Sequence, residues 1–150
     1  PAGGRRPALG LEEGVQEEAA ELLSQLTPPP ESPPGTLTAL GALALELRQP
    51  DDAVRFFAAA LASSPNDQSI VEQLAIARGL TGDLAGAVSA LERALQQAPS
   101  SPSLHLNLAV THAQSGRMAD ARREVLEALR LRPDYPQALR FLERLRNAPH

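Results

Sequence analysis

The sequence predicts an all-α fold of helix–turn–helix repeats, and two observations carry this prediction. The 150-residue chain repeats itself at a step of 34 residues without a gap. Each repeat also contains two apolar stretches at helical spacing, separated by a turn. In the second repeat, Val71, Leu74 and Ala75 line one helix, and Val88 and Leu91 line the next. A period of roughly 20 to 50 residues is typical of stacked arrays, so the repeats are expected to pack one upon the next.

Seven columns of residues keep the 34-residue step. Several columns hold only small residues, which let two helix backbones approach closely, and a larger side chain there would overpack the contact. The columns are Gly41, Ala75 and Ala109; Ala53, Ala87 and Ala121; Ala60, Ala94 and Ala128; Leu40, Leu74 and Leu108; Phe57, Leu91 and Val125; Leu61, Leu95 and Leu129; Pro65, Pro99 and Pro133.

This pattern resembles the tetratricopeptide repeat, whose motif runs W-x2-L-G-x2-Y, then A-x3-F, then a closing Pro. The first unit matches with Leu40 and Gly41, then Ala53 and Phe57, then Pro65, and the next two units match at the same step. The resemblance implies a right-handed α-solenoid. Its three units cover residues 34–67, 68–101 and 102–135, and a capping helix covers 136–147.

The chain departs from this motif in two ways. The motif's Trp and Tyr columns hold smaller, polar or basic residues, such as His105 and Arg78. Because each missing ring removes a large buried surface, we expect leaner packing between helices. The first unit also has Arg48 in its internal turn, where the second and third units have Gly82 and Gly116.

Helical spacing and prolines suited to a first helical turn locate the repeat helices. Ser101 is expected to be an N-cap. The last helix is expected to cover the third unit with Leu139, Leu142 and Leu145. The expected helices cover residues 36–48, 51–63, 68–80, 84–97, 103–115, 118–131 and 136–147.

Three segments are predicted before the repeats. Residues 1–10 are expected to be disordered. Residues 11–26 are expected to form a helix. Residues 27–35, which read Thr-Pro-Pro-Pro-Glu-Ser-Pro-Pro-Gly, are expected to form a stiff, extended linker.

The helix expected over residues 11–26 has two interpretations. It carries glutamates around an apolar face that consists of Val15, Ala19, Leu22, Leu23 and Leu26. Ala19, Leu23 and Leu26 lie 34 residues before Ala53, Phe57 and Ala60, which favours the second helix of a decayed repeat that caps the first unit. Alternatively, the helix occupies the groove as an internal ligand, with its acidic face on Arg140 and Arg144. Disorder and exchange with a neighbouring molecule are further alternatives.

Charge and composition exclude some classes of function. The formal charge is −4 and is unevenly distributed: residues 1–101 hold 13 acidic residues and 6 Arg, and residues 102–150 hold 5 acidic residues and 8 Arg. An acidic chain is a poor match for nucleic acid, because such binding depends on phosphate contacts. No apolar run approaches the roughly 18 residues of a membrane span, so membrane insertion is not expected. The basic C-terminal third favours an acidic partner.

Catalytic, metal and cofactor sites have little support in the sequence. The chain has neither Cys nor Lys, which excludes disulfides, thiolate chemistry and lysine catalysis. His105 and His112 are seven residues apart, whereas the usual helical metal pair is four apart. Both are therefore expected to be structural, and no enzymatic activity, metal or cofactor is expected.

The resemblance implies a place for a partner. In this family, the first helix of each unit lines an inner, concave face. The floor of that face is expected to be apolar, with two Arg at its C-terminal end. The expected partner-binding groove consists of Leu45, Glu72, Ile76, Leu80, Leu106, Val110, Gln114, Arg140 and Arg144.

Some relatives grip a partner's C-terminal carboxylate with Lys, Asn and Arg on this face. The matching positions of this chain hold Thr38, Ala42, Gln73, Ser103 and Asn107. Only Asn107 retains the residue type, so we expect this clamp to be absent.

The expected function is that of a non-enzymatic scaffold or adaptor, which binds a protein or peptide segment of apolar and acidic character in the groove. A preformed surface favours such binding, because little has to be ordered when the partner arrives. The alternative is an accessory domain of a larger protein, either an enzyme or an envelope assembly factor. Such a domain would dock or dimerise the larger protein. A self-associating module, such as a homodimer, is a third interpretation. Because no Met begins the chain, we expect a processed form or a part of a longer protein. The sequence favours no compartment.

Overall fold

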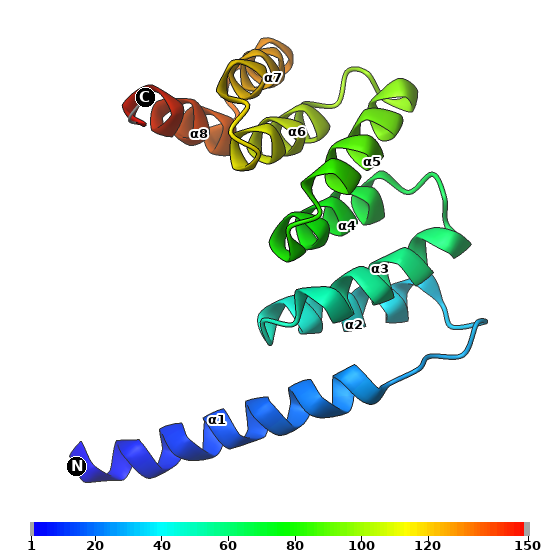
Figure 1. Ribbon diagram of the computed structural model, residues 1–150, viewed down its shortest axis with the longest axis vertical. Helices are drawn as coiled ribbons and strands as arrows, with labels where there is room; N and C mark the ends of the chain where they lie inside the picture. The colour runs from blue at the N-terminus through cyan, green and yellow to red at the C-terminus, as the bar shows by residue number, and fades with distance from the viewer. Residues whose placement is uncertain (1, 149–150) are drawn as a thin grey trace. The chain divides into compact units, whose positions relative to one another are not determined.

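The computed structural model describes residues 2–148, with side chains from residue 12 onward. Within these residues, the chain is built from α-helices and has no strand (Figure 1). The all-α repeat fold is confirmed, and the repeat helices begin and end within two residues of their expected bounds. The helices are α1 (Ala2–Gln25), α2 (Pro34–Glu46), α3 (Pro50–Ser63), α4 (Gln68–Thr81), α5 (Leu84–Gln97), α6 (Pro102–Gln114), α7 (Met118–Leu131) and α8 (Pro136–Asn147).

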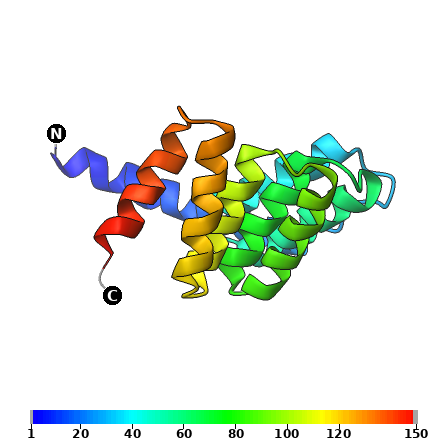
Figure 2. The same cartoon turned by 90° about the horizontal axis from the view of Figure 1, so that it is seen from above.

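The chain divides into two compact parts, an N-terminal part with α1 to α3 and a C-terminal part with α4 to α8. In the N-terminal part, α2 packs on α3, and α1 contacts α2. In the C-terminal part, α4 packs on α5 and α6 on α7, and further contacts join α5 to α6 and α4 to α6. Figure 2 shows α8 lying beside α7, which it contacts. No helix that the structure describes is both long enough and apolar enough to cross a bilayer.

Side-chain caps and prolines fix where the repeat helices begin. The Oγ of Ser101 accepts a hydrogen bond from the backbone N–H of Leu104 at 3.3 Å, which confirms the expected N-cap of α6. Asp67 and Asp83 cap α4 and α5 in the same way. A proline occupies the first turn of α2, α3, α6 and α8. Its missing N–H costs nothing there, because that N–H has no partner within the helix.

The turn inside each repeat ends its first helix in the same conformation. Gly82 and Gly116 have φ values of 94° and 78°, and Arg48 takes the equivalent place with φ 59°. In each turn, the residue after this position donates its N–H to a carbonyl five residues earlier, as Gln49 does to Ala44 at 2.8 Å. Glycine adopts this left-handed backbone freely, whereas a residue with a Cβ does so at a cost. The first repeat therefore makes the same turn as the others with a strained arginine.

Small residues allow the two helices of each repeat to approach. Ala53, Ala87 and Ala121 are each 0% exposed. A Cβ added to Gly41 would lie 2.5 Å from the ring of Phe57, so the column that begins with Gly41 admits no larger residue in the first repeat. The helix pairs consequently depend on residue size at these positions.

The third repeat and α8 share one core. Leu106 and Val125 pack with Ala138, Phe141 and Leu142 of α8. The expectation that Leu139 covers the third repeat is wrong, because Leu139 is 48% exposed. Leu142 is buried as expected and Leu145 packs against the cluster, but the aromatic side chain of this face is Phe141, which was not among the expected leucines. Phe141 lies one helical turn from both Ala138 and Leu145, so these residues share one face of α8 and Leu139 does not.

The segment before the repeats differs from its expectation in two places. Residues 1–10 were expected to be disordered, but α1 already begins at Ala2. Extending a formed helix adds one hydrogen bond for each residue fixed, which explains why the helix continues through this stretch. The linker is not extended throughout, because Ser32 donates its N–H to Pro29 in a turn. Of the expected apolar face of α1, only Leu23 is buried.

Ala121→Leu is expected to lower the free energy of unfolding by about 1–3 kcal/mol, because the added atoms have no room between α6 and α7. Ala119→Leu is the matched control, since Ala119 is exposed on the same helix. The measurement is the urea unfolding midpoint. Equal midpoints for the two variants would contradict the role assigned to the small column.

Arg48→Gly is expected to raise the free energy of unfolding by about 0.5–1 kcal/mol. The substitution removes a left-handed cost of about 1–2 kcal/mol and adds back a glycine entropy cost of about 0.5–1 kcal/mol. Gly82→Ala, made as the reverse change in the second repeat, should destabilise the protein. Thermal and urea unfolding of both variants measure the effect, and a loss of stability with Arg48→Gly would refute it.

Candidate functional site

The first helices of successive repeats form one face of the C-terminal part. α4 contacts α6, and α6 and α8 meet in a shared core. The 34-residue register relates equivalent residues of α4, α6 and α8 along this face. One row holds Glu72, Leu106 and Arg140, and the next holds Ile76, Val110 and Arg144. We call this surface the inner face, and it consists of Glu72, Ile76, Leu80, Val110, Gln114, Arg140 and Arg144.

Most of the expected groove residues are accessible on this face. Ile76 is 47% exposed and Leu80 is 59% exposed, and because they lie one helical turn apart they form one exposed apolar patch. Gln114, Arg140 and Arg144 are also exposed. Leu45 belongs to α2 in the N-terminal part, where it is half-buried.

Leu106 does not belong to the accessible surface, and its expected place in the groove is wrong. It is 8% exposed and packs with Ala109, Val125 and Phe141. Val110 is half-buried and packs against the same cluster, so it contributes to the core as well. The physical reason is that α8 lies over this end of α6 and covers it with an aromatic ring.

Glu72 is held in place by two hydrogen-bond donors. Gln68 donates from Nε2 to Glu72 Oε1 at 2.9 Å, and Ser103 of α6 donates from Oγ to the same oxygen at 2.6 Å. Burial raises the pKa of the Tyr135 phenol, and the nearby Glu72 charge adds to this rise. Gln68 and Tyr135 were not among the expected site residues. The register gives a signal for Tyr135 alone, because it is equivalent to Ser101 at the same edge.

Gln114 and Gly79 meet at the opposite edge of the inner face. A Cβ at Gly79 would lie 3.0 Å from Gln114 Oε1, so the amide of α6 rests directly on the backbone of α4. Leu80 follows this contact and remains exposed. The amide therefore borders the apolar patch of Ile76 and Leu80.

The exposed face of α8 is polar and basic. Gln137, Arg140, Glu143, Arg144 and Asn147 line a hollow on this helix. Among residues 12–148, no acidic side chain forms an ion pair with Arg140 or Arg144. The Arg144 guanidinium lies 5.6 Å from the ring centroid of Phe141, which steadies it without neutralising its charge. Both guanidiniums are therefore able to bind a carboxylate.

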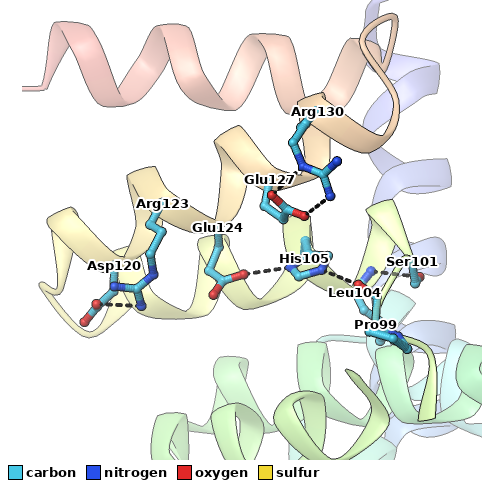
Figure 3. A network of polar contacts seen from close by, with 9 residues as sticks. All are labelled: Pro99, Ser101, Leu104, His105, Asp120, Arg123, Glu124, Glu127 and Arg130. Atoms are coloured by element: carbon cyan, nitrogen blue, oxygen red, sulfur yellow. Dashed lines mark hydrogen bonds and ion pairs between the residues drawn. The ribbon is translucent and has the colours of Figure 1, made fainter. Parts of the chain in front are cut away.

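The histidines that the structure describes, His105 and His112, both lie on α6. His105 lies between α7 and the loop before α6 (Figure 3), with Nδ1 2.7 Å from Glu124 Oε2 and Nε2 2.8 Å from the carbonyl oxygen of Pro99. His112 is 4% exposed. Nearby, the hydrogen bond from Arg130 lowers the pKa of the Glu127 carboxyl. His150 lies outside the described residues. Within those residues, no three metal-ligating side chains gather around one point.

Family models place the chain among known repeats. Two models described as tetratricopeptide repeat match residues 38–102 and residues 80–145. Together they span α3 to α7 and most of α2 and α8. No curated protein sequence matches the chain.

Solved structures with a similar fold have low sequence identity. YrrB, described as a TPR protein with an unusual peptide-binding site, is 20% identical with a TM-score of 0.70, over 89% of this chain and 69% of that chain. The first TPR of Spaghetti (RPAP3), bound to an HSP90 peptide, is 16% identical with a TM-score of 0.67, over 76% of this chain and 90% of that chain. An O-GlcNAc transferase of Thermobaculum terrenum is 24% identical with a TM-score of 0.68, over 80% of this chain and 23% of that chain. These similarities concern the fold alone.

Two substitutions with contrasting expected effects test the orientation of the inner face. Ile76→Glu is expected to lower the free energy of unfolding by only about 0.5 kcal/mol, because the carboxylate stays in water. Leu106→Glu, on the adjacent helix, is expected to cost about 3–5 kcal/mol or to prevent folding, because it buries a charge without a partner. Circular dichroism and urea unfolding distinguish the two. If Ile76→Glu unfolds the protein, Ile76 belongs to the core and the inner face is wrongly oriented.

Proposed function

Because the chain belongs to the tetratricopeptide repeat family, we propose that it is a non-enzymatic interaction module that binds a protein segment on the inner face. The observation that carries the proposal is an exposed apolar patch on α4 together with a basic patch on α8 whose two Arg form no ion pair within residues 12–148. Ile76 and Leu80 expose large apolar surface on α4, and Arg140 and Arg144 expose guanidiniums on α8. A segment with apolar and acidic side chains matches both patches.

The register gives the bound segment a direction. Across the inner face, the equivalent positions change from Glu72 on α4 to Arg140 on α8, and from Ile76 to Arg144. Acidic side chains of a ligand are attracted to α8 and repelled by Glu72, whose carboxylate is fixed by Gln68 and Ser103. The apolar part of the segment therefore lies over α4, and its acidic part lies over α8.

Similar folds in other proteins support the binding of a peptide. The Spaghetti (RPAP3) domain is bound to an HSP90 peptide, and YrrB is described as having a peptide-binding site. The carboxylate clamp of some relatives is not part of the proposal, since Ser103, at one of its positions, has its hydroxyl engaged with Glu72.

A second candidate is a docking domain within a larger protein. The match to the Thermobaculum terrenum transferase supports it, because that match covers only 23% of a longer chain. The inner face would then bind another part of the same assembly. A homodimer is a further form of this candidate.

The test is to select peptides on the wild-type chain from a random display library and to measure their affinities by fluorescence anisotropy. We expect selected peptides to combine apolar residues with Asp or Glu. Arg140→Glu with Arg144→Glu should weaken them about tenfold or more, equivalent to roughly 1.4 kcal/mol, and the loss should shrink at high salt. Arg146→Glu, on the opposite face of α8, is the matched control. Peptides that bind all three proteins equally would show that the inner face is not the site.

A further inference from the structure

A second exposed surface lies on α1, outside the repeats. Val15 is 63% exposed and Leu22 is 61% exposed, and Leu26, the residue that follows the helix, is 42% exposed. With the half-buried Ala19, these residues follow one another at spacings of four, three and four. That spacing forms one apolar stripe along a helix, and it is the spacing of the seam between two packed helices. We call it the α1 stripe.

Apart from the half-buried Ala19, the α1 stripe is not used in holding α1 to the repeats. Leu23, at the edge of the stripe, is the only buried side chain among residues 12–26. The remaining attachment is polar and lies at the end of the helix. Arg55 of α3 donates to the carbonyl oxygens of Leu26 at 2.6 Å and Leu23 at 3.1 Å, and Ser24 donates to Asp52 at 2.8 Å.

This attachment fixes the end of α1 and leaves the stripe free. A guanidinium at a helix C-terminus satisfies the last carbonyls and complements the negative end of the helix dipole. Asp52 holds Arg55 in this position through an ion pair of 3.1 Å. α1 is therefore anchored through its last turn, and the helix does not have to be ordered when a partner packs along its stripe.

The charges beside the stripe define the partner. Residues 12–26 contain five exposed glutamates and no arginine. Glu12 and Glu18 flank the stripe on its two sides, by helical spacing. A second copy of α1 would bring like charges together, and the negative surface of a phospholipid membrane would repel them as well. Lys or Arg beside an apolar seam complements them.

From these observations, we propose that the α1 stripe is a docking site for a basic amphipathic helix of a partner protein. Apolar residues of the partner pack on Val15, Ala19, Leu22 and Leu26, and its Lys or Arg side chains pair with the flanking glutamates. This site is separate from the inner face and does not depend on its function.

The probe is a labelled peptide of about three heptads, with Leu at the two core positions and Lys at the flanking positions. A second peptide carries Glu in place of each Lys. Fluorescence anisotropy on the wild-type chain is expected to show binding of the Lys peptide at low salt, at least about tenfold weaker binding of the Glu peptide, and a loss of this difference at high salt.

Val15→Ala with Leu22→Ala removes the exposed apolar surface and keeps good helix formers in α1. It is expected to weaken the Lys peptide at least about tenfold, with unchanged circular dichroism. Leu126→Ala with Leu139→Ala removes a similar exposed surface from α7 and α8 and should bind the peptide like the wild type. Ile76→Glu should also bind normally, which separates this site from the inner face.

Three results would overturn the proposal. One is the absence of binding by the Lys peptide, or equal binding of the two peptides. Another is equal binding by the wild type and the Val15→Ala, Leu22→Ala variant. The last is self-association of the wild type in light scattering that this variant abolishes, which would make a second copy the occupant of the stripe.

Discussion

The close approach of the two helices in each repeat is the constraint on which the rest of the structure depends. Ala87 and Ala121 are completely buried, and Gly41 has no room for a Cβ beside Phe57. With aromatic residues at only 3% of the chain, the protein has few large side chains to fill a wider gap. All three Phe lie toward the ends of the array, in α3 and α8, so the core around α4 and α5 is built from Ala and Leu, with Val88 packed against it. Their packing is tight because it is built from small residues at short distances.

The same register shows how a polar pair replaces an apolar contact. His105 and Glu124 are equivalent to Leu37 and Phe56 in the first repeat, and both of those are buried. In the third repeat, the imidazole and the carboxylate meet at 2.7 Å and remain partly exposed. The second imidazole nitrogen satisfies Pro99, so this polar contact also positions the loop before α6. A partly buried polar pair is tolerated when its polar groups have partners. The His105 imidazole also makes a hydrogen bond to the Pro99 carbonyl, which a leucine at this position could not make.

The sequence predicted the helices well because the repeat provides the same information three times. Small columns, prolines and caps all locate the same boundaries, and the structure follows them closely. Exposure was harder to predict. Leu106 and Ile76 are both apolar and lie on equivalent helices. Phe141 of α8 covers Leu106, whereas Ile76 remains exposed. The register identifies equivalent residues, whereas burial depends on the side chains of the next helix, and here those side chains depart from the family pattern. Leu139 was misplaced for the same reason.

Among residues 12–148, two exposed surfaces have opposite chemistry, which the net charge of −4 conceals. The α1 stripe is apolar and edged by glutamates, and the exposed face of α8 is basic. The residue at position 143 explains why α8 differs from the equivalent helices α4 and α6. The column of Gly41, Ala75 and Ala109 continues there as Glu143, which is exposed. In α4 and α6 this column is buried against a second helix. A carboxylate at the same place favours water over close packing, because burial without a partner would be costly. The polar character of α8 thus extends around the helix from Glu143 to Arg140 and Arg144, which keeps their charges accessible to a ligand.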